Sequence, residues 1–123
     1  MFINLTNHPS SEWGMIQKNA AIEQYGNIID LPFPAVAPDW SELMIQERAD
    51  EYFHKCVELI GVEKSGSAVH LAGELSFCFY LAQLLLHEGY TCVTSTTKRI
   101  VETHGNVKKS TFQFCCFRKL SLL

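Results

Sequence analysis

Short apolar runs alternate with longer amphipathic segments over most of the chain. Four runs of strand length, residues 2–5, 27–31, 68–71 and 90–94, are rich in apolar and β-branched side chains. Apolar residues at helical spacing follow the first three runs, which predicts three helices. The expected helices begin at Ser10 or Ser11, at Asp39 or Ser41, and after the turn Ala72–Glu74, and they stop at Gly26, Gly61 and Gly89.

Three successive strand–helix units favour one mainly parallel sheet, because right-handed crossovers carry the chain between parallel neighbours. Helices then cover both faces, which is a three-layer, Rossmann-like α/β fold. Residues 99–103 and 110–117 alternate in polarity around His104–Asn106, so a C-terminal β-hairpin is expected to extend the sheet of about four strands. A length of 123 residues fits a single domain, residues 1–123. The hairpin residues expected on one face are Phe112, Phe114 and Cys116.

The segment from Leu75 to Leu86 is apolar on nearly all sides of the predicted third helix. Such a helix is either sandwiched in the core or covered by another subunit, so a homodimer is expected. Gln83 interrupts the run before it reaches the roughly 18 consecutive apolar residues of a membrane span. The N-terminus has no basic region followed by an apolar run, so no secretory signal is predicted and a cytoplasmic location is expected.

The cysteines point to structural rather than chemical roles. The chain has five of them and no CxxC pair, and Cys56, Cys78 and Cys92 lie within apolar runs, where thiols are usually buried. Cys115 and Cys116 are adjacent in a predicted strand and so point to opposite faces, which disfavours a shared metal ion. The absence of GxGxxG and of GxxxxGK[ST] disfavours a dinucleotide cofactor and an ATP-hydrolysing P-loop. No metal and no cofactor is predicted.

Charge is unevenly distributed along the chain. Residues 1–88 hold four basic and twelve acidic side chains, whereas residues 89–123 hold six basic side chains and one acidic side chain. The cationic last third either suppresses edge pairing of the hairpin or faces an anion. A net charge of −3 and the shortness of the cationic stretch disfavour binding of long DNA or RNA.

Polar residues gather where the four predicted strands end. Ligands of parallel sheets bind at the carboxyl ends of the strands, where free backbone N–H groups and helix dipoles favour anions. Hydroxyls, amides and one group of cations suit phosphate oxygens and nucleotide edges better than a nucleophile–base triad. The candidate residues are Asn7, His8, Ser10 and Ser11 after the first strand, Pro32–Pro34 after the second, Gly73, Glu74 and Ser76 after the third, and Ser95, Thr96, Thr97 and Arg99 after the fourth.

Several candidates have a structural alternative. His8 lies in a polar loop and could act as an acid or base, or form turn hydrogen bonds. His70 lies inside a strand, where a core histidine with satisfied hydrogen bonds is expected. Glu74 could serve as a base or bind a ribose hydroxyl, or it could complement the dipole of its helix. Arg99 could contact an anion or form a salt bridge.

The segments NLTNHPSSEW, YGNIIDLPFP, AVHLAGELSF, CVTSTTKRIVE and STFQFCCFRKL resemble a family. Together they are similar to the small stand-alone CRISPR-associated proteins with a CARF-like, Rossmann-type domain, a group with ring-nuclease-like members. The resemblance spans nearly the whole chain, and none of the segments is a catalytic signature. It implies a homodimer that binds cyclic oligoadenylate, with cyclic tetra-adenylate as the expected ring, across the two-fold axis at the carboxyl ends of the sheets. The positions that match the family's pattern are Asn7, His8, Ser10, Gly73, Glu74, Ser95, Thr96, Thr97 and Arg99.

Some proteins of this family cleave the ring without a metal and others only hold it. Cleavage needs an in-line attack of a 2′-hydroxyl on the adjacent phosphate, with the ribose ordered and the charge stabilised. Arg99 would stabilise that charge, Ser10 and Thr96 would hold phosphates, and His8 would carry the proton. Two alternatives remain open: a non-catalytic sponge or sensor for the cyclic nucleotide, and a Rossmann-like protein-interaction subunit without a ligand.

Overall fold

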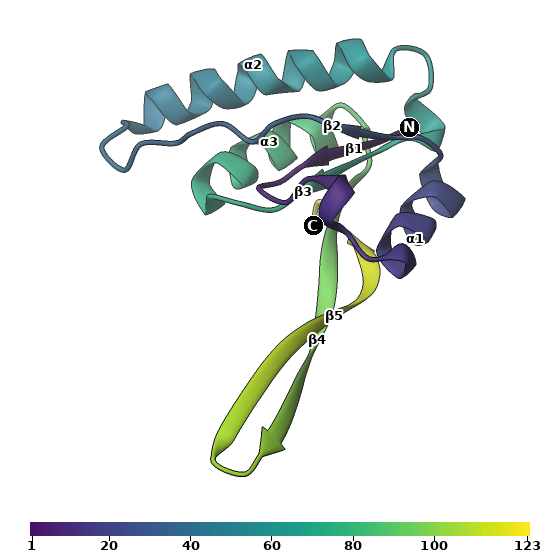
Figure 1. Ribbon diagram of the computed structural model, residues 1–123. Coiled ribbons are helices and arrows are strands. Elements are labelled where there is room, and N and C mark those ends of the chain that lie inside the picture. The colour runs from purple at the N-terminus through teal and green to yellow at the C-terminus, as the bar shows by residue number, and fades with distance from the viewer.

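Three of the five strands are short, because each is a brief apolar run bounded by turn residues. The computed structural model describes residues 1–123 and forms a single five-stranded sheet (Figure 1). The two C-terminal strands are far longer and form the predicted hairpin. The strands are β1 (Phe2–Leu5), β2 (Ile28–Asp30), β3 (Ala68–Leu71), β4 (Cys92–His104) and β5 (Val107–Lys119).

The strand order β2-β1-β3-β4-β5 confirms the predicted Rossmann-like α/β fold. The first four strands are parallel, and β5 is antiparallel to β4. From β1 the chain steps to β2 through α1 (Met15–Tyr25), and it then returns past β1 to β3 through α2 (Glu42–Ile60). α3 (Leu75–His87) connects β3 to β4. The connections therefore diverge between β1 and β3, which is where sheets of this type bind ligands.

The two faces of the sheet have separate cores. Ile3, Leu5 and Val69 point toward α2 and α3 and pack with Phe77 and Leu81 of α3. The opposite face packs against α1 and the turn before it, and its smaller core consists of Phe2, Trp13, Ala21, Ala68 and Val93. Adjacent residues of a strand alternate between these cores, as the pleat requires. The α1 face has the smaller apolar core, and this leaves room for polar groups there.

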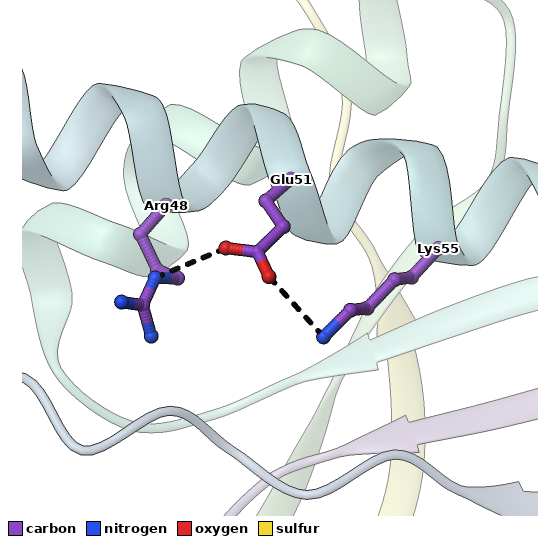
Figure 2. A network of polar contacts seen from close by, with 3 residues as sticks. All are labelled: Arg48, Glu51 and Lys55. Carbon is purple, nitrogen blue, oxygen red and sulfur yellow. Dashed lines mark ion pairs between the residues drawn. The ribbon is translucent and has the colours of Figure 1, made fainter.

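α2 is held by an apolar stripe and solvated on its other side. Ser41, one of the two caps that the sequence predicted, caps its first turn, with the side-chain oxygen accepting from Met44 N at 3.2 Å. Figure 2 shows Glu51 between Arg48 and Lys55, with ion-pair distances of 3.2 Å and 3.5 Å. Such exposed pairs contribute only about 0.3–0.5 kcal/mol each, so burial of the stripe dominates. The buried stripe is Ile45, Ala49, Tyr52, Cys56 and Ile60.

The predicted start of the first helix is wrong. Ser10–Glu12 form a 3₁₀ turn, and α1 begins at Met15 after an extended Trp13. The reason is tertiary, because Ser10 donates its hydroxyl and its backbone N–H to Asp30 at the end of β2, at 2.7 Å and 3.0 Å. A serine engaged by another strand is not available to cap its own helix.

The predicted break in the fourth strand is also wrong. β4 runs without interruption from Cys92 to His104, although Ser95–Lys98 was expected to be a loop. Only Cys92 and Val93 pair with β3, and the rest of β4 pairs with β5 alone. The hairpin therefore leaves the sheet as a long protrusion, seen at the bottom of Figure 1. We call residues 98–113 the arm.

A β-bulge at the base of the arm changes which side chains share a face. Thr96 pairs with Cys116 but Thr97 pairs with Phe114, so Cys115 is the extra residue. Phe114 consequently lies on the same face as Phe117, with ring centroids 4.8 Å apart. The prediction that Phe112, Phe114 and Cys116 share one face therefore fails for Cys116. The arm ends in a two-residue turn in which Gly105 has φ 64°, a conformation that glycine adopts without strain.

None of the three helices combines the length and the apolarity that crossing a membrane would require.

Candidate functional site

A cavity of about 560 Å³ opens on the α1 face of the sheet, at the point where the connections diverge. The carboxyl ends of β1 and β3, the base of the arm and the start of α1 bound it. Pockets of this volume accommodate small ligands. The side chains that line it are hydroxyls, aromatic rings and two imidazoles, with Glu12 as the one charged group apart from histidine. The lining residues used below are Thr6, His8, Trp13, Met15, Ile16, Gln17, His70, Ser95, Thr97, Phe112 and Phe114.

A row of hydrogen-bonded polar side chains crosses the sheet beneath this cavity. Asp30 on β2, Asn4 on β1 and His70 on β3 are neighbours in strand register. Asn4 Nδ2 donates to Asp30 Oδ1 at 2.8 Å, and Asn4 Oδ1 lies 3.0 Å from His70 Nδ1. Asn4 and His70 are buried, with 1% and 2% of their surface exposed. These bonds fix the amide and the imidazole in one orientation.

The hydrogen-bond network also determines which nitrogen of His70 carries the proton. Asn4 Nδ2 faces two acceptors, Asp30 Oδ1 and the His8 carbonyl, so the amide oxygen must face His70. An amide oxygen only accepts, and therefore His70 Nδ1 must donate. His70 Nε2 is left with a lone pair, and it is buried without a hydrogen-bond partner. Burial lowers the pKa of His70 from 6.5 to about 4, so the ring is neutral at pH 7.

The His8 backbone, rather than its ring, organises the loop after β1. Its carbonyl oxygen accepts from Asn4 Nδ2 at 2.9 Å and from Trp13 Nε1 at 3.2 Å, and its N–H donates to Thr6 Oγ1 at 3.1 Å. The imidazole of His8 is exposed at the cavity. The turn-forming role predicted as an alternative for His8 is therefore present, and it positions the Trp13 ring over His70, with centroids 5.6 Å apart.

The N-terminus of α1 supplies donors to the cavity. Gly14 is the N-cap, has no side chain to cap the helix, and its carbonyl accepts the first intrahelical bond from Lys18. The N–H groups of Met15, Ile16 and Gln17 thus have no partner within the helix, and all three residues line the cavity. A helix N-terminus with free N–H groups favours negative charge.

The structure brings only some of the predicted site residues together. His8, Ser95 and Thr97 line the cavity. Asn7 lies in a neighbouring depression beside Asp30, Ser10 is bonded to that aspartate, and Ser11 is exposed in the 3₁₀ turn. Thr96 lies on the other face of β4, where its hydroxyl is 3.1 Å from Cys116 Sγ. Arg99 lies on the arm, outside the cavity lining.

Residues 73–76 begin α3 rather than line the cavity. Gly73 has φ 154° and packs against the Phe33 ring, and a Cβ at this position would come within 2.4 Å of that ring. Glu74 accepts from Phe77 N at 2.8 Å, from Ser76 N at 3.1 Å and from the Ser76 hydroxyl. These bonds, above all that from the Ser76 hydroxyl, lower the pKa of Glu74. The capping role therefore accounts for Gly73, Glu74 and Ser76 without a ligand.

Cys56 and Cys92 are buried, as predicted, whereas Cys78 is half-buried. Burial raises the pKa of Cys56 and of Cys92 to about 12, and that of Cys78 to about 11, which makes these thiols poor nucleophiles. Cys115 and Cys116 are exposed at the arm base. No group of three or more His, Cys, Asp and Glu side chains is placed to hold a metal ion.

Comparison with known families assigns the chain. It matches the Uncharacterized protein MJ1673 family over residues 1–118, nearly its whole length. The chain is a member of the MJ1673 family. No curated protein and no solved structure matches it. The family name states no activity, so the chemistry of this MJ1673 family member must be argued from its cavity.

The sequence did not single out four residues of this MJ1673 family protein that line the cavity or lie directly beneath it. Asn4 had one signal, an amide inside the apolar run of β1, and Thr6 stands among the turn-forming residues that follow this run. His70 was predicted to be a satisfied core histidine, which holds for Nδ1 and fails for Nε2. Trp13 was not singled out either, because nothing local reveals its bond to the His8 carbonyl.

Proposed function

We propose that the protein binds cyclic oligoadenylate, with one nucleotide in the cavity between β1, β3 and α1. The observation that carries this proposal is the combination of free α1 N–H groups with a buried, neutral and unpartnered His70 at one cavity. The α1 N–H groups suit a phosphate, and His70 Nε2 suits an uncharged hydrogen-bond donor on a nucleotide base. A nucleotide is a ligand that presents both groups in one molecule.

Each part of a nucleotide finds matching chemistry around the cavity. A phosphate would accept from the N–H groups at Met15–Gln17, and ribose or phosphate oxygens would bond the hydroxyls of Ser95 and Thr97. The aromatic rings, including Phe112, offer stacking surfaces for a base. Adenine carries an exocyclic amine, which can donate a hydrogen bond to the unpartnered His70 Nε2.

Binding without cleavage is the form of this function that the geometry supports better. The proposed catalytic pair was His8 and Arg99, but the Arg99 guanidinium donates to Ser110 Oγ on the arm, at 3.0 Å and 3.3 Å. No lysine or arginine lines the cavity. A phosphorane formed inside the cavity would have helix N–H groups and hydroxyls around it, but no side-chain cation.

A homodimer belongs to the same proposal. Leu75 and Phe79 are four residues apart on α3 and are 80% and 60% exposed. Apolar side chains exposed side by side on a helix are typical of a protein interface. Light scattering on the purified protein would then give twice the chain mass of 13.9 kDa, and Phe79→Ser would reduce it toward one chain. A monomer at all concentrations would remove this part of the proposal.

The decisive experiment is a calorimetric titration with cyclic tetra-adenylate and cyclic hexa-adenylate in EDTA. Thr97→Val removes a hydroxyl at the cavity, and Thr96→Val removes one from the next residue on the opposite face. We expect Thr97→Val to weaken binding by ~5-fold to 10-fold, the loss of one hydrogen bond, and Thr96→Val to leave it within ~2-fold. Equal effects, or no binding by the unaltered protein, would overturn the proposal.

Chromatography of the same samples distinguishes a binder from a ring nuclease. We expect the cyclic ligand to be recovered intact after hours with excess protein. Linear adenylate products in EDTA would instead establish metal-independent cleavage, and His8→Ala would then show whether the exposed imidazole carries the proton.

A further inference from the structure

The arm has two chemically distinct faces. Strand pairing places Arg99 opposite Phe112, and Thr97 opposite Phe114. Since side chains alternate along a strand and paired residues share a face, these four residues lie on one side of the ribbon. Thr97, Phe112 and Phe114 line the cavity, so this is the side of the arm that continues from it. We call it the cavity face.

Hydrogen bonding independently supports this assignment. The Arg99 guanidinium donates to Ser110 Oγ from Nε at 3.3 Å and from Nη2 at 3.0 Å, and Ser110 is two residues from Phe112 on β5. The Arg99 side chain therefore lies along the cavity face, where it is exposed. Lys108 belongs to the same face by alternation. The opposite face carries Lys98 and Lys109, and of its residues Gln113 alone lines the cavity.

The cavity face carries positive charge beside a cavity whose own lining has no lysine or arginine. Residues 1–88 carry a balance of −8, and Glu12 lines the cavity itself. A single phosphate can be satisfied by the N–H groups at the start of α1. Further phosphates of a longer ligand would meet an acidic body unless they run along the arm.

The volume of the cavity also indicates that a longer ligand extends onto the arm. A volume of about 560 Å³ is within the range of pockets that hold one drug-sized molecule, so a ring of four nucleotides does not fit inside. The remainder must lie outside the cavity. Phe112 stands at this boundary, 70% exposed, and its ring faces the same side as Arg99. An exposed aromatic next to a cation is a surface on which bases stack and phosphates pair.

We propose that the ligand site extends from the cavity along the cavity face of the arm, with Phe112 as a stacking surface and Arg99 as a phosphate contact, Lys108 lying farther along the same face. This inference rests on the proposed nucleotide binding and deepens it: the ligand is an oligonucleotide whose outer phosphates contact the arm, and not a mononucleotide. The charges of the opposite face, Lys98 and Lys109, take no part in binding.

The chain provides its own matched controls for this proposal. Arg99→Gln and Lys98→Gln each remove one positive charge from adjacent residues that lie on opposite faces. Lys108→Gln and Lys109→Gln repeat the comparison nearer the tip. All four side chains are exposed, so folding is not at risk, and the melting temperature of each variant checks this.

The test measures binding of cyclic tetra-adenylate and of AMP by each variant. For cyclic tetra-adenylate we expect Arg99→Gln to weaken binding ~10-fold or more, the loss of a charge-assisted hydrogen bond, and Lys98→Gln by less than ~3-fold. Arg99→Gln should also reduce the slope of log affinity against log salt by ~0.7 to 1, the value for one lost phosphate contact. AMP should bind every variant equally, because it occupies the cavity alone.

The outcomes separate this inference from the proposed function. If neither ligand binds the unaltered protein, nucleotide binding itself is refuted. If both bind but Arg99→Gln and Lys98→Gln behave alike for the ring, the arm extension is refuted and the cavity proposal stands. If Arg99→Gln weakens AMP as much as the ring, Arg99 belongs to the cavity and the preference for an oligonucleotide is refuted.

Discussion

The carboxyl-end edge of the parallel strands, called the edge below, and the arm differ in how their polar side chains are held. At the edge, the polar groups Asn4 and His70 are buried, are fixed by hydrogen bonds between strands, and belong to an acidic part of the chain. On the arm, Arg99 and its neighbours are exposed, cationic and held by a two-stranded ribbon without a core. The edge can select a ligand by shape and hydrogen bonding, whereas the arm can only add charge and surface. Stability should therefore depend on the edge and be nearly indifferent to the arm.

The strongest expected effect follows from removal of Asn4. Asn4→Ala leaves Asp30 with one partner fewer and leaves the His70 Nδ1–H buried without an acceptor. We expect a loss of about 3–4 kcal/mol in the free energy of unfolding, since each orphaned buried polar group costs about 1–3 kcal/mol. Urea denaturation measures it. Ser110→Ala, which removes a hydrogen bond on the arm, is the control and should cost less than about 0.5 kcal/mol.

The pH dependence of stability should be dominated by His70 in mildly acidic solution. Burial lowers the pKa of this ring from 6.5 to about 4, so between these values the unfolded chain binds a proton that the native protein does not. Stability is thus fully present above pH 6.5 and declines as the pH falls toward 4, by about 3 kcal/mol in total. The groups around the ring are Asn4, Phe2, Trp13 and Phe117, none of which titrates in this window.

Denaturation at several pH values tests this expectation. His70→Gln should flatten the decline between pH 6.5 and 4. Burial alone would raise the pKa of Asp30, but the hydrogen bonds from Asn4 and Ser10 together outweigh it and lower this pKa below its usual value of 3.8. The contribution of Asp30 to stability is therefore lost only at lower pH. A native His70 that titrates near 6.5 by NMR would show that the ring is not buried as described.

Replacement of the glycine at the turn into α3 should lower the free energy of unfolding by a smaller amount. In Gly73→Ala the new Cβ would meet the Phe33 ring at 2.4 Å, and the φ of 154° is unfavourable for alanine. We expect destabilisation of about 2 kcal/mol, since strained backbone costs about 1–3 kcal/mol. The thermal midpoint measures it, with Gly105→Ala at the arm turn as the comparison: there φ is also positive but no atom lies within 4 Å, so only the conformational cost remains.

The sequence predicted best the features that depend on local chemistry. β3 was predicted with the bounds that the structure shows, because turn residues flank a short apolar run, and Ser41 caps α2 as expected. The start of α1 was mispredicted, because Ser10 bonds to Asp30, twenty residues away. The length of β4 was also missed, because the hydroxyl-rich segment Ser95–Lys98 suits loop and strand alike, and pairing with β5 makes it strand.

In the site, too, the features that depend on local sequence were predicted and those that depend on distant residues were not. The rule for carboxyl ends of parallel strands placed Ser95 and Thr97 at the cavity, and two-residue alternation then removes Thr96 from it. Asn4 and His70 were not chosen, because their importance lies in a hydrogen bond between residues 66 apart in sequence. A single sequence carries no local signal for such a bond.

The smallest expected effect on stability is that of shortening the arm. Removal of residues 100–103 together with residues 108–111 deletes four paired positions from each strand and leaves the register, the bulge and the turn intact. Because the arm buries no core residue, the free energy of unfolding should change by less than about 0.5 kcal/mol. This variant also removes Lys108 and the Ser110 that holds Arg99, so binding of cyclic tetra-adenylate should weaken while that of AMP should not. A large loss of stability would mean that the arm is packed against another surface in solution, and a second copy of the chain is the surface to examine by measuring the mass of the shortened protein.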